Sequence, residues 1–272
     1  RNLLTYIRNG AIFKSHKTYK DTMIYKEIER SILMPTKYYF DNAATTPVRE
    51  EVLQEILPYF REYYGNASSI YSIAKESKKA LEAARAKVAA AIGATPDEIY
   101  FTAGGSESDN MALRGVVNAS KKEKKHIITT KIEHHAILHT AEFLETKGVD
   151  VTYLNVDEFG KISLEELENA IRPETVLISV MFANNEIGTI QPIAEIAEIA
   201  KKHGVLFHTD AVQAVGHVPI DVEKLHVDLL SMSGHKLGAP KGIGAIYIRK
   251  GTRISPLIFG GAQEKKLRAG TE

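Results

Sequence analysis

The stretch LLSMSGHKLGAPKGIGAIYI, residues Leu229 to Ile248, joins two apolar runs through a polar segment that is rich in glycine. Residues 227–233 and 244–250 have the length and composition of buried strands. Lys236 lies directly after the first of them, in the tetrapeptide Ser-Gly-His-Lys. A lysine in this position is either a solvated residue that ends the strand or a desolvated amine that can attack a carbonyl carbon. The rest of the chain decides between these two interpretations.

Further apolar runs precede this stretch, and most are separated by segments with helical periodicity. The predicted strands are 98–102, 126–130, 149–156, 175–183, 205–211, 227–233 and 244–250. The predicted helices are 70–92, 106–118, 135–147, 163–171 and 193–203. One more helix is predicted to begin with Thr46 as its N-cap, Ser163 and Glu166 suggest a capping box, and Gly93 and Gly204 end two helices. This alternation predicts an α/β fold with a mainly parallel, seven-stranded sheet sandwiched by helices, in which ligands bind beyond the carboxyl ends of the strands.

Composition excludes several classes of function. The chain has 35 basic and 34 acidic residues, so its net charge of +1 gives no overall field that attracts nucleic acid or an anionic membrane. No apolar run approaches the length of a membrane span, and the N-terminus lacks the apolar core of a signal peptide, so we expect a cytoplasmic protein. The chain has no cysteine, which excludes disulfides, thiolate metal sites and a thiol nucleophile within residues 1–272.

Residues 1–33 differ in charge from the rest of the chain, with seven basic residues and three acidic ones. The segment MPTKYYFDNAATTP, which begins at Met34, has the character of a natural start. We therefore expect residues 1–33 to form an extension outside the fold and residues 34–272 to form one large domain. A targeting presequence is the weaker alternative for residues 1–33, because acidic residues are rare in such segments.

The segment FTAGGSESDNMAL, residues 101–113, places two glycines and Ser106 between a predicted strand and a predicted helix. Glycines allow close backbone approach, and a helix N-terminus offers free N–H groups with a partial positive charge. Together with the Ser106 hydroxyl, these groups can hold a phosphate. A plain tight turn with Ser106 as N-cap explains the segment equally well.

Two other strand ends carry groups for the same site. Asp210 lies at the end of the fifth predicted strand, and Gln213 follows three residues later. An acid in this position faces the ligand crevice and needs a cationic partner there, although a helix-capping Asp is the alternative. Ser233 and His235 can donate hydrogen bonds to a phosphate beside Lys236. An anion cradle, an acid for a ring nitrogen and a lysine that forms a Schiff base are the parts that hold pyridoxal phosphate.

Polar residues after two further strands fit this site. His134 follows the strand 126–130, where its imidazole can lie flat on an aromatic cofactor ring, with a helix-capping histidine as the alternative. Asn184 and Asn185 follow the strand 175–183. Their amides can bond a ring hydroxyl or a substrate carboxylate, although a pair of asparagines is also common in turns.

The motifs YFDNAATTP, GGSESDN, EHHAI, NNEIGTIQP, HTDAVQAVG, SGHKLGAPKGIG and RAGTE follow one another between residues 38 and 272. In order and spacing they resemble the cysteine desulfurases of the class V, fold type I pyridoxal phosphate enzymes. The resemblance implies the large cofactor-binding domain of that fold, a homodimer, and a role for each of ten residues. These are Lys236 as the cofactor lysine, His134 stacked on the ring, Asp210 at the ring nitrogen, Gln213 at the ring oxygen, Asn185 near that oxygen and the substrate carboxylate, Gly105, Ser106, Ser233 and His235 at the phosphate, and Thr271 at the phosphate of the neighbouring subunit.

The resemblance also implies a reaction. Lys236 would remove the α-proton of L-cysteine, and a cysteine thiolate would then accept the substrate sulfur as a persulfide and leave L-alanine. The sulfur would pass to an iron–sulfur scaffold or another acceptor protein. The chain stops at Glu272 in mid-motif and has no cysteine. We therefore expect a fragment that lacks most of a small C-terminal domain, binds the cofactor and does not complete sulfur transfer.

Two other interpretations stay open at this point. The chain could belong to another class V enzyme, such as a selenocysteine lyase or a transaminase-like relative. It could also be a non-catalytic scaffold that keeps the fold and binds iron–sulfur assembly partners. The presence of Lys236, Asp210 and His134 together argues against a scaffold, because a scaffold does not need a lysine that forms a Schiff base.

Overall fold

Residues 38–272 are described by the structure, which is a computed structural model of the protein. The chain divides into two units, Arg1–Phe40 and Asp41–Glu272. In the described part of the first unit, the rings of Tyr38 and Phe40 stack with their centroids 6.3 Å apart. The expected extension, residues 1–33, lies outside the described residues and stays a prediction. All helices and strands of the described residues belong to the second unit.

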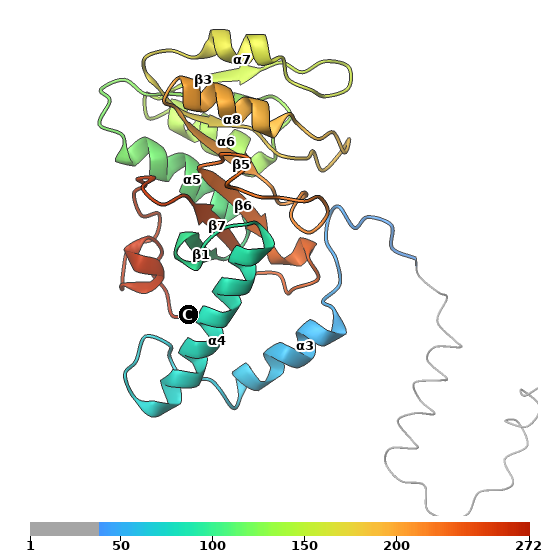
Figure 1. The fold of residues 1–272 in the computed structure, drawn as a ribbon, viewed down its shortest axis with the longest axis vertical. Coiled ribbons are helices and arrows are strands. Elements are labelled where there is room, and N and C mark those ends of the chain that lie inside the picture. Colours follow the sequence, from blue (N-terminus) through green and yellow to red (C-terminus); the bar gives the residue numbers. More distant parts are fainter. Residues whose placement is uncertain (1–37) are drawn as a thin grey trace, which may run out of the picture. The chain divides into compact units, whose positions relative to one another are not determined.

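A seven-stranded sheet forms the centre of the unit Asp41–Glu272 (Figure 1). The strand order is β1-β7-β6-β5-β4-β2-β3, in which β7 is antiparallel to both neighbours and all other adjacent pairs are parallel. The strands are β1 (Ile99–Thr102), β2 (His126–Thr130), β3 (Asp150–Leu154), β4 (Thr175–Ser179), β5 (Leu206–Asp210), β6 (Leu229–Ser233) and β7 (Gly244–Ile248). The predicted mainly parallel sheet is therefore confirmed. Several strands are shorter than predicted, because the residues after their carboxyl ends turn into loops.

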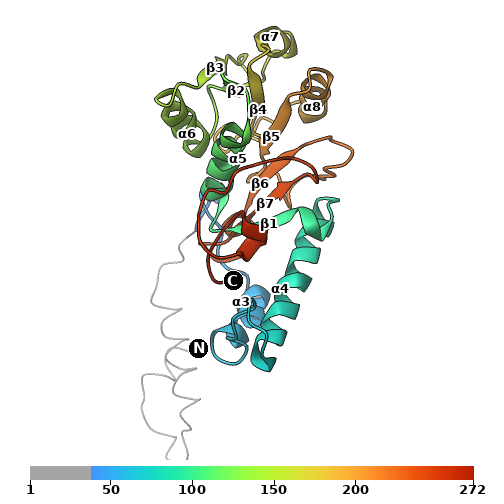
Figure 2. The same cartoon turned by 90° about the vertical axis from the view of Figure 1, so that its left-hand side faces the viewer.

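Helices cover both faces of the sheet (Figure 2). Ile127 of β2 packs with α5 and α6 on one face, and Ile128 packs with α4, α7 and α8 on the other. This follows from the two-residue period of a strand, which points successive side chains to opposite faces. The α-helices are α3 (Glu50–Ile56), α4 (Ser72–Ala91), α5 (Gly105–Ala119), α6 (His135–Glu145), α7 (Leu164–Ala170) and α8 (Ile193–Lys202). The 3-10 helices are η1 (Leu57–Phe60), η2 (Pro96–Glu98), η3 (Gly234–Lys236) and η4 (Gln263–Lys266).

The predicted start of the first helix at Thr46 is wrong, because α3 begins at Glu50. Thr46 instead holds a loop of the site: its N–H and its hydroxyl donate to the carbonyl oxygen of His235, at 3.1 and 2.7 Å. The same hydroxyl accepts a hydrogen bond from the N–H of Gly238 at 3.1 Å. The hydroxyl of Thr46, which an N-cap would use to accept from the helix backbone, is therefore bonded to residues of the loop instead. No side chain of α3 is buried, and Phe60, the last residue of the following η1, is 71% exposed.

The other predicted helix signals are mostly confirmed. The helix α4 ends just before Gly93, and α8 ends just before Gly204. At the start of α7 the hydroxyl of Ser163 accepts from the N–H of Glu166 at 3.2 Å. The carboxylate of Glu166 accepts from Asn155 rather than from the backbone of Ser163, so only half of the predicted capping box forms.

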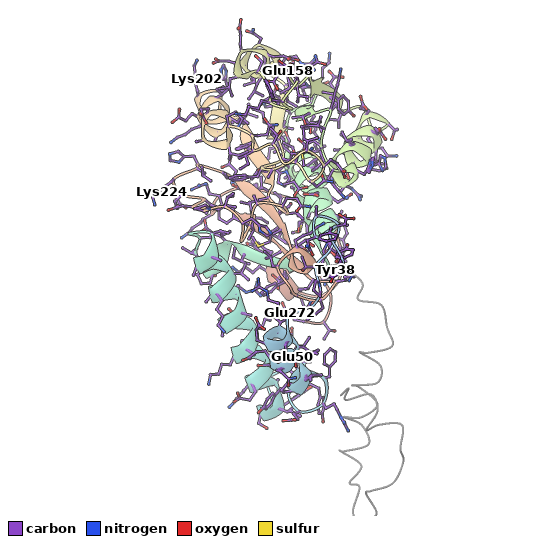
Figure 3. All side chains as sticks on the ribbon, turned by 90° about the vertical axis from the view of Figure 1, so that its right-hand side faces the viewer. Tyr38, Glu50, Glu158, Lys202, Lys224 and Glu272 are labelled. Carbon is purple, nitrogen blue, oxygen red and sulfur yellow. The ribbon has the colours of Figure 1, made fainter. Side chains whose placement is uncertain are left out.

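Many charged side chains of the helices lie on the outside of the helical layers. Figure 3 shows Lys202 at the end of α8 pointing away from the sheet, where its Nζ lies 2.6 Å from Oε1 of Glu168 on α7. Such exposed pairs contribute little to stability, so the sheet and its two apolar clusters hold the fold together. Within residues 38–272, no helix has both the length and the apolar character that crossing a bilayer requires.

Candidate active site

A cavity of about 360 Å³ lies beyond the carboxyl ends of β5 and β6, next to the start of α5. This is the edge of a parallel sheet at which ligands of α/β proteins bind. Nine of the ten residues that the sequence singled out line this cavity, and Thr271 is the exception. The nine are Gly105, Ser106, His134, Asn185, Asp210, Gln213, Ser233, His235 and Lys236. Thr271 is exposed near the end of the chain and is not among the residues that line the cavity.

Lys236 ends the 3-10 helix η3, which follows β6 directly. Its Nζ donates to the carbonyl oxygens of Ala43 and Ala44, the latter at 2.9 Å. Partial burial lowers the pKa of this amine, while the carboxylates of Asp41 and Asp210 act in the opposite direction. Lys236 is thus a half-buried residue that lines the cavity, and not a fully solvated residue that only ends the strand. A lowered pKa makes the neutral, nucleophilic form more available.

The segment that follows Asp41 lies against the lysine and is fixed from two sides. Nε2 of Gln213 donates to the carbonyl oxygen of Ala43 at 2.9 Å, so this oxygen accepts from both Gln213 and Lys236. Nδ1 of His235 lies 3.0 Å from the hydroxyl of Thr45. These bonds connect a segment near residue 43 with two loops that lie between 170 and 193 residues further along the chain.

Asp210 is the last residue of β5 and is 6% exposed. Its Oδ1 accepts a hydrogen bond from the N–H of Val212 at 2.9 Å. The alternative of a helix-capping Asp is wrong, because β5 is followed by a turn and not by a helix; Asp210 bonds this turn and also lines the cavity. Burial raises the pKa of this carboxyl, while the bond from Val212 and the nearby His134 and Lys236 favour the ionised form.

His134 is the N-cap of α6, and its Nδ1 accepts from the N–H of Ala136 at 3.1 Å. It also lines the cavity, so capping and a cofactor role do not exclude each other. Because the cap uses Nδ1, the ring keeps Nε2 for other contacts. The orientation of the imidazole is thus fixed by the helix that it caps.

The glycine segment at the start of α5 also lines the cavity, through Gly105 and Ser106. Gly104, with a φ of 148°, is the N-cap of this helix, so the predicted alternative of Ser106 as N-cap is wrong. Ser106 is the second helical residue, and the N-terminus of a 15-residue helix therefore opens toward the cavity. A Cβ added at Gly105 would come within 2.7 Å of Cγ2 of Val212, so a larger residue does not fit there. Free N–H groups at such a helix start favour an anion.

The two asparagines after β4 have different roles. Asn184 is buried and stabilises the turn, because its Oδ1 accepts from the N–H groups of Glu186 and Ile187. Asn185 lines the cavity, and its Nδ2 donates to Oε1 of Glu186 at 2.7 Å. The turn interpretation thus describes Asn184, and the ligand interpretation stays open for Asn185.

The aminotransferase class-V family matches residues 38–271 of the chain. The chain belongs to this family. Members of the class V family are pyridoxal phosphate enzymes, which is in accord with the residues that line the cavity.

Relatives within the class V family share long stretches of sequence with this chain. The cysteine desulfurase IscS of Methanosarcina thermophila is 63% identical over 234 residues, which are 86% of this chain and 58% of that protein. The cysteine desulfurase IscS of Clostridium botulinum (strain Kyoto / Type A2) is 58% identical over 239 residues, which are 88% of this chain and 60% of that protein. The chain therefore spans about three fifths of the length of these two relatives.

Solved structures confirm the predicted fold class. A NifS-like protein superposes with a TM-score of 0.85 at 48% identity, over 87% of this chain and 66% of that chain. The structure of SspA in complex with cysteine also gives a TM-score of 0.85, at 45% identity, over 87% of this chain and 69% of that chain. The resemblance to the cysteine desulfurases that the motifs suggested is thus confirmed.

Sequence reasoning missed several residues that line or adjoin this class V site. The most important is Asp109 on α5, which lines the cavity although it is 1% exposed. Its position four residues after Gly105 on a helix was the available signal, because this spacing places both residues on one face. Glu133, one residue before His134, is also buried and carries a strongly raised pKa of about 8.

Proposed function

We propose that this chain carries the cofactor site of a pyridoxal phosphate-dependent cysteine desulfurase, which takes sulfur from L-cysteine and leaves L-alanine. One observation carries the proposal: a half-buried lysine, a buried carboxyl and a helix N-terminus converge on one cavity of about 360 Å³. The relatives that are named cysteine desulfurases support the same activity. The neighbour solved with cysteine supports cysteine as the substrate.

The residues around the cavity fit this cofactor. The start of α5 together with Ser106 and Ser233 offers donors for a phosphate, and the absence of a Cβ at Gly105 lets the helix start pack against Val212. The buried carboxyl of Asp210 suits a protonated ring nitrogen, because a buried carboxylate needs a cationic partner. Lys236 presents an amine with a lowered pKa on the same cavity. The donor set therefore matches the three parts of the cofactor: phosphate, ring nitrogen and aldehyde.

The chain's own residues divide the work of the reaction. Pyridoxal phosphate, when bound, supplies a sink for the electron pair that is left when Cα of the substrate loses its proton. Nζ of Lys236 would hold the cofactor and, once released by the substrate amine, would take that proton. Asp210 would keep a proton on the ring nitrogen, and His134 would lie against the ring. Asn185 would bind the substrate carboxylate, and Gln213 the ring oxygen.

Sulfur transfer needs a thiolate that attacks the substrate sulfur, so that the persulfide forms as L-alanine leaves. Residues 1–272 contain no cysteine, and the thiol of this proposed step therefore has to come from outside these residues. The proposed assembly is a homodimer in which Thr271 serves the neighbouring site. The proposed sulfur acceptor is an iron–sulfur scaffold or another carrier protein, and the proposed location is the cytoplasm.

Borohydride trapping tests this proposal. The protein is incubated with pyridoxal phosphate, reduced with borohydride, digested and mapped by mass spectrometry. We expect a single stable phosphopyridoxyl label on the peptide that contains Lys236. The label should be lost in Lys236→Ala and kept in Lys241→Ala, which removes an exposed lysine from the same loop. Labelling spread over several surface lysines, and unchanged in Lys236→Ala, would contradict the proposal.

A further inference from the structure

Asp109 has no role in the reaction as proposed, yet it is one of the most completely buried acids of the described residues. It lies on α5, lines the same cavity as Asp210, and is 1% exposed. Its Oδ1 is buried without a hydrogen-bond partner. An ionised carboxylate in such a place is very unfavourable, whereas a protonated carboxyl is tolerated.

The groups around Asp109 give it no positive charge. From β5, Nε2 of His208 lies 3.8 Å from Oδ1 of Asp109. Both ring nitrogens of His208 are within 2.9 Å of serine hydroxyls, those of Ser179 and Ser231. Burial lowers the pKa of His208 to about 3, so this imidazole is neutral at physiological pH. His208 therefore does not compensate a negative charge on Asp109. A hydrogen bond from Ser231 favours the ionised form of Asp109, but burial and the neighbouring Asp210 act in the opposite direction and raise its pKa.

The other ionisable groups that act on Asp109 are themselves acids. They are Asp210 at the end of β5 and Glu133 in the loop after β2. Oε1 of Glu133 accepts from the hydroxyl of Thr130 and from the N–H of Met181, and burial raises its pKa to about 8. Three carboxyls thus share one buried region, and their mutual repulsion favours protonated forms.

Asp210 is better placed than Asp109 to carry the negative charge of this pair. Its Oδ1 receives a hydrogen bond from the N–H of Val212, and the nearby His134 and Lys236 favour its ionised form. Burial raises the pKa of both carboxyls, and that of Asp109 lies well above its ordinary value. Two adjacent buried carboxylates cannot both ionise easily, so one proton stays with the pair.

We propose that Asp109 is a positioning residue that holds the proton of this carboxyl pair and thereby keeps Asp210 as the carboxylate that faces the cofactor. The inference rests on the proposed function, because Asp210 needs to be ionised only where it pairs with a cationic ring nitrogen. A neutral Asp109 removes the repulsion that would otherwise push a proton onto Asp210. The pair titrates as a unit, with Asp210 losing the first proton and Asp109 the second.

Infrared spectroscopy of protein labelled with [4-13C]aspartate tests the assignment. The label separates aspartic acid carbonyl bands from those of Glu133. Spectra are recorded at neutral pH before and after addition of pyridoxal phosphate, for the wild type, Asp109→Asn and Asp210→Asn. The matched control is Asp228→Asn, which removes another partly buried aspartate whose neighbours are Phe207 and Arg249.

We expect a labelled carboxylic acid band in the wild type, its loss in Asp109→Asn, and its retention in Asp210→Asn and in Asp228→Asn. In Asp210→Asn the band should also titrate at lower pH than in the wild type, by about one unit or more, because the neighbouring charge is gone. A purely structural role of Asp109 predicts no such shift. Even if Asp109→Asn does not fold, the retained and shifted band in Asp210→Asn decides the assignment.

Three results would overturn the inference: no acid band in the wild type at neutral pH, a band that is lost in Asp210→Asn, or a band that is lost in Asp228→Asn. Failure of the proposed function gives a different signature, because borohydride would then fail to fix pyridoxal phosphate on Lys236 whatever the acid band does. Trapping on Lys236 in a protein without the Asp109 band would refute this inference alone.

Discussion

Gly105 is the first residue of α5 and lines the cavity. Substitution by alanine tests whether this position requires a glycine. A Cβ at this position would approach Cγ2 of Val212 to 2.7 Å. Overpacking of this kind costs about 1–3 kcal/mol of the free energy of unfolding. We therefore expect Gly105→Ala to destabilise the protein by that amount in urea unfolding and to weaken the binding of pyridoxal phosphate. The double variant with Val212→Ala removes the clash and should recover most of both losses; no recovery would show that the clash is not the cause.

Glu133 predicts a specific dependence of stability on pH. Burial raises the pKa of this carboxyl to about 8 in the folded protein, from an ordinary value of 4.5. Between these two values the unfolded chain binds fewer protons than the folded protein, so the free energy of unfolding falls as the pH rises. The slope from this one group is at most about 1.4 kcal/mol per pH unit.

The comparison of the wild type with Glu133→Gln isolates this contribution. The amide oxygen introduced by this substitution can replace Oε1 as acceptor for Thr130 and Met181, and the amide does not titrate. Urea unfolding at several pH values should show the stability of the wild type falling relative to the variant from about pH 5 to pH 8, with a constant difference at higher pH. Parallel curves over this range would show that Glu133 is already ionised in the folded protein.

At the scale of elements, one buried ion pair connects α4 with η4. The two terminal guanidinium nitrogens of Arg85, Nη1 and Nη2, donate to Glu264 at 2.8 and 2.9 Å, and Oε2 of Glu264 also accepts from the N–H of Phe101 on β1. Both side chains are almost fully buried. Removal of one partner of such a pair leaves an uncompensated charge, which costs roughly 3–5 kcal/mol.

We expect Glu264→Gln to lower the free energy of unfolding by about 3 kcal/mol in urea titrations. Arg85 provides its own control, because its Nε also lies 3.8 Å from Oε1 of Glu82, which is exposed. An exposed pair is worth little, so Glu82→Gln should change stability by less than about 0.5 kcal/mol. Equal effects of the two substitutions would contradict the role assigned to burial.

At the scale of the whole molecule, exposed apolar side chains are concentrated on one part of the unit Asp41–Glu272. Large apolar side chains are exposed around α3 and the start of α4, among them Phe60 at 71%, Tyr64 at 67% and Ile70 at 97%. Exposed apolar groups of this size on neighbouring segments are typical of surfaces that bind another protein. They support the proposal that this protein works as an assembly.

The proposed homodimer predicts a mass in solution of about twice 30.1 kDa, measured by sedimentation equilibrium. A mass of 30.1 kDa at every concentration would contradict it. Within the dimer, Thr271→Ala should weaken the binding of pyridoxal phosphate about tenfold, the effect of losing one hydrogen bond to a charged group. Thr252→Ala, in a turn after β7, serves as the matched control and should leave the affinity unchanged.

Local sequence signals determined most of the fold. Each predicted strand contains the observed one, because a short apolar run rich in β-branched residues is a property of a few neighbouring positions. The polar residues that follow the predicted strands, from Gly105 to Lys236, were also expected to gather at one site, and they line one cavity because parallel strands bring their carboxyl ends to one edge.

Only the tertiary structure decided which hydrogen bonds the residues of the site form and which of them are buried. Thr46 is bonded to the loop around His235 rather than capping a helix. His134 caps α6 and Asp210 accepts from the turn after β5, while both line the cavity. The burial of Asp109 beside Asp210 has no local signal beyond one helical spacing. Its protonation depends on groups from three segments of the chain, and electrostatic free energy is a property of the folded neighbourhood rather than of the residue.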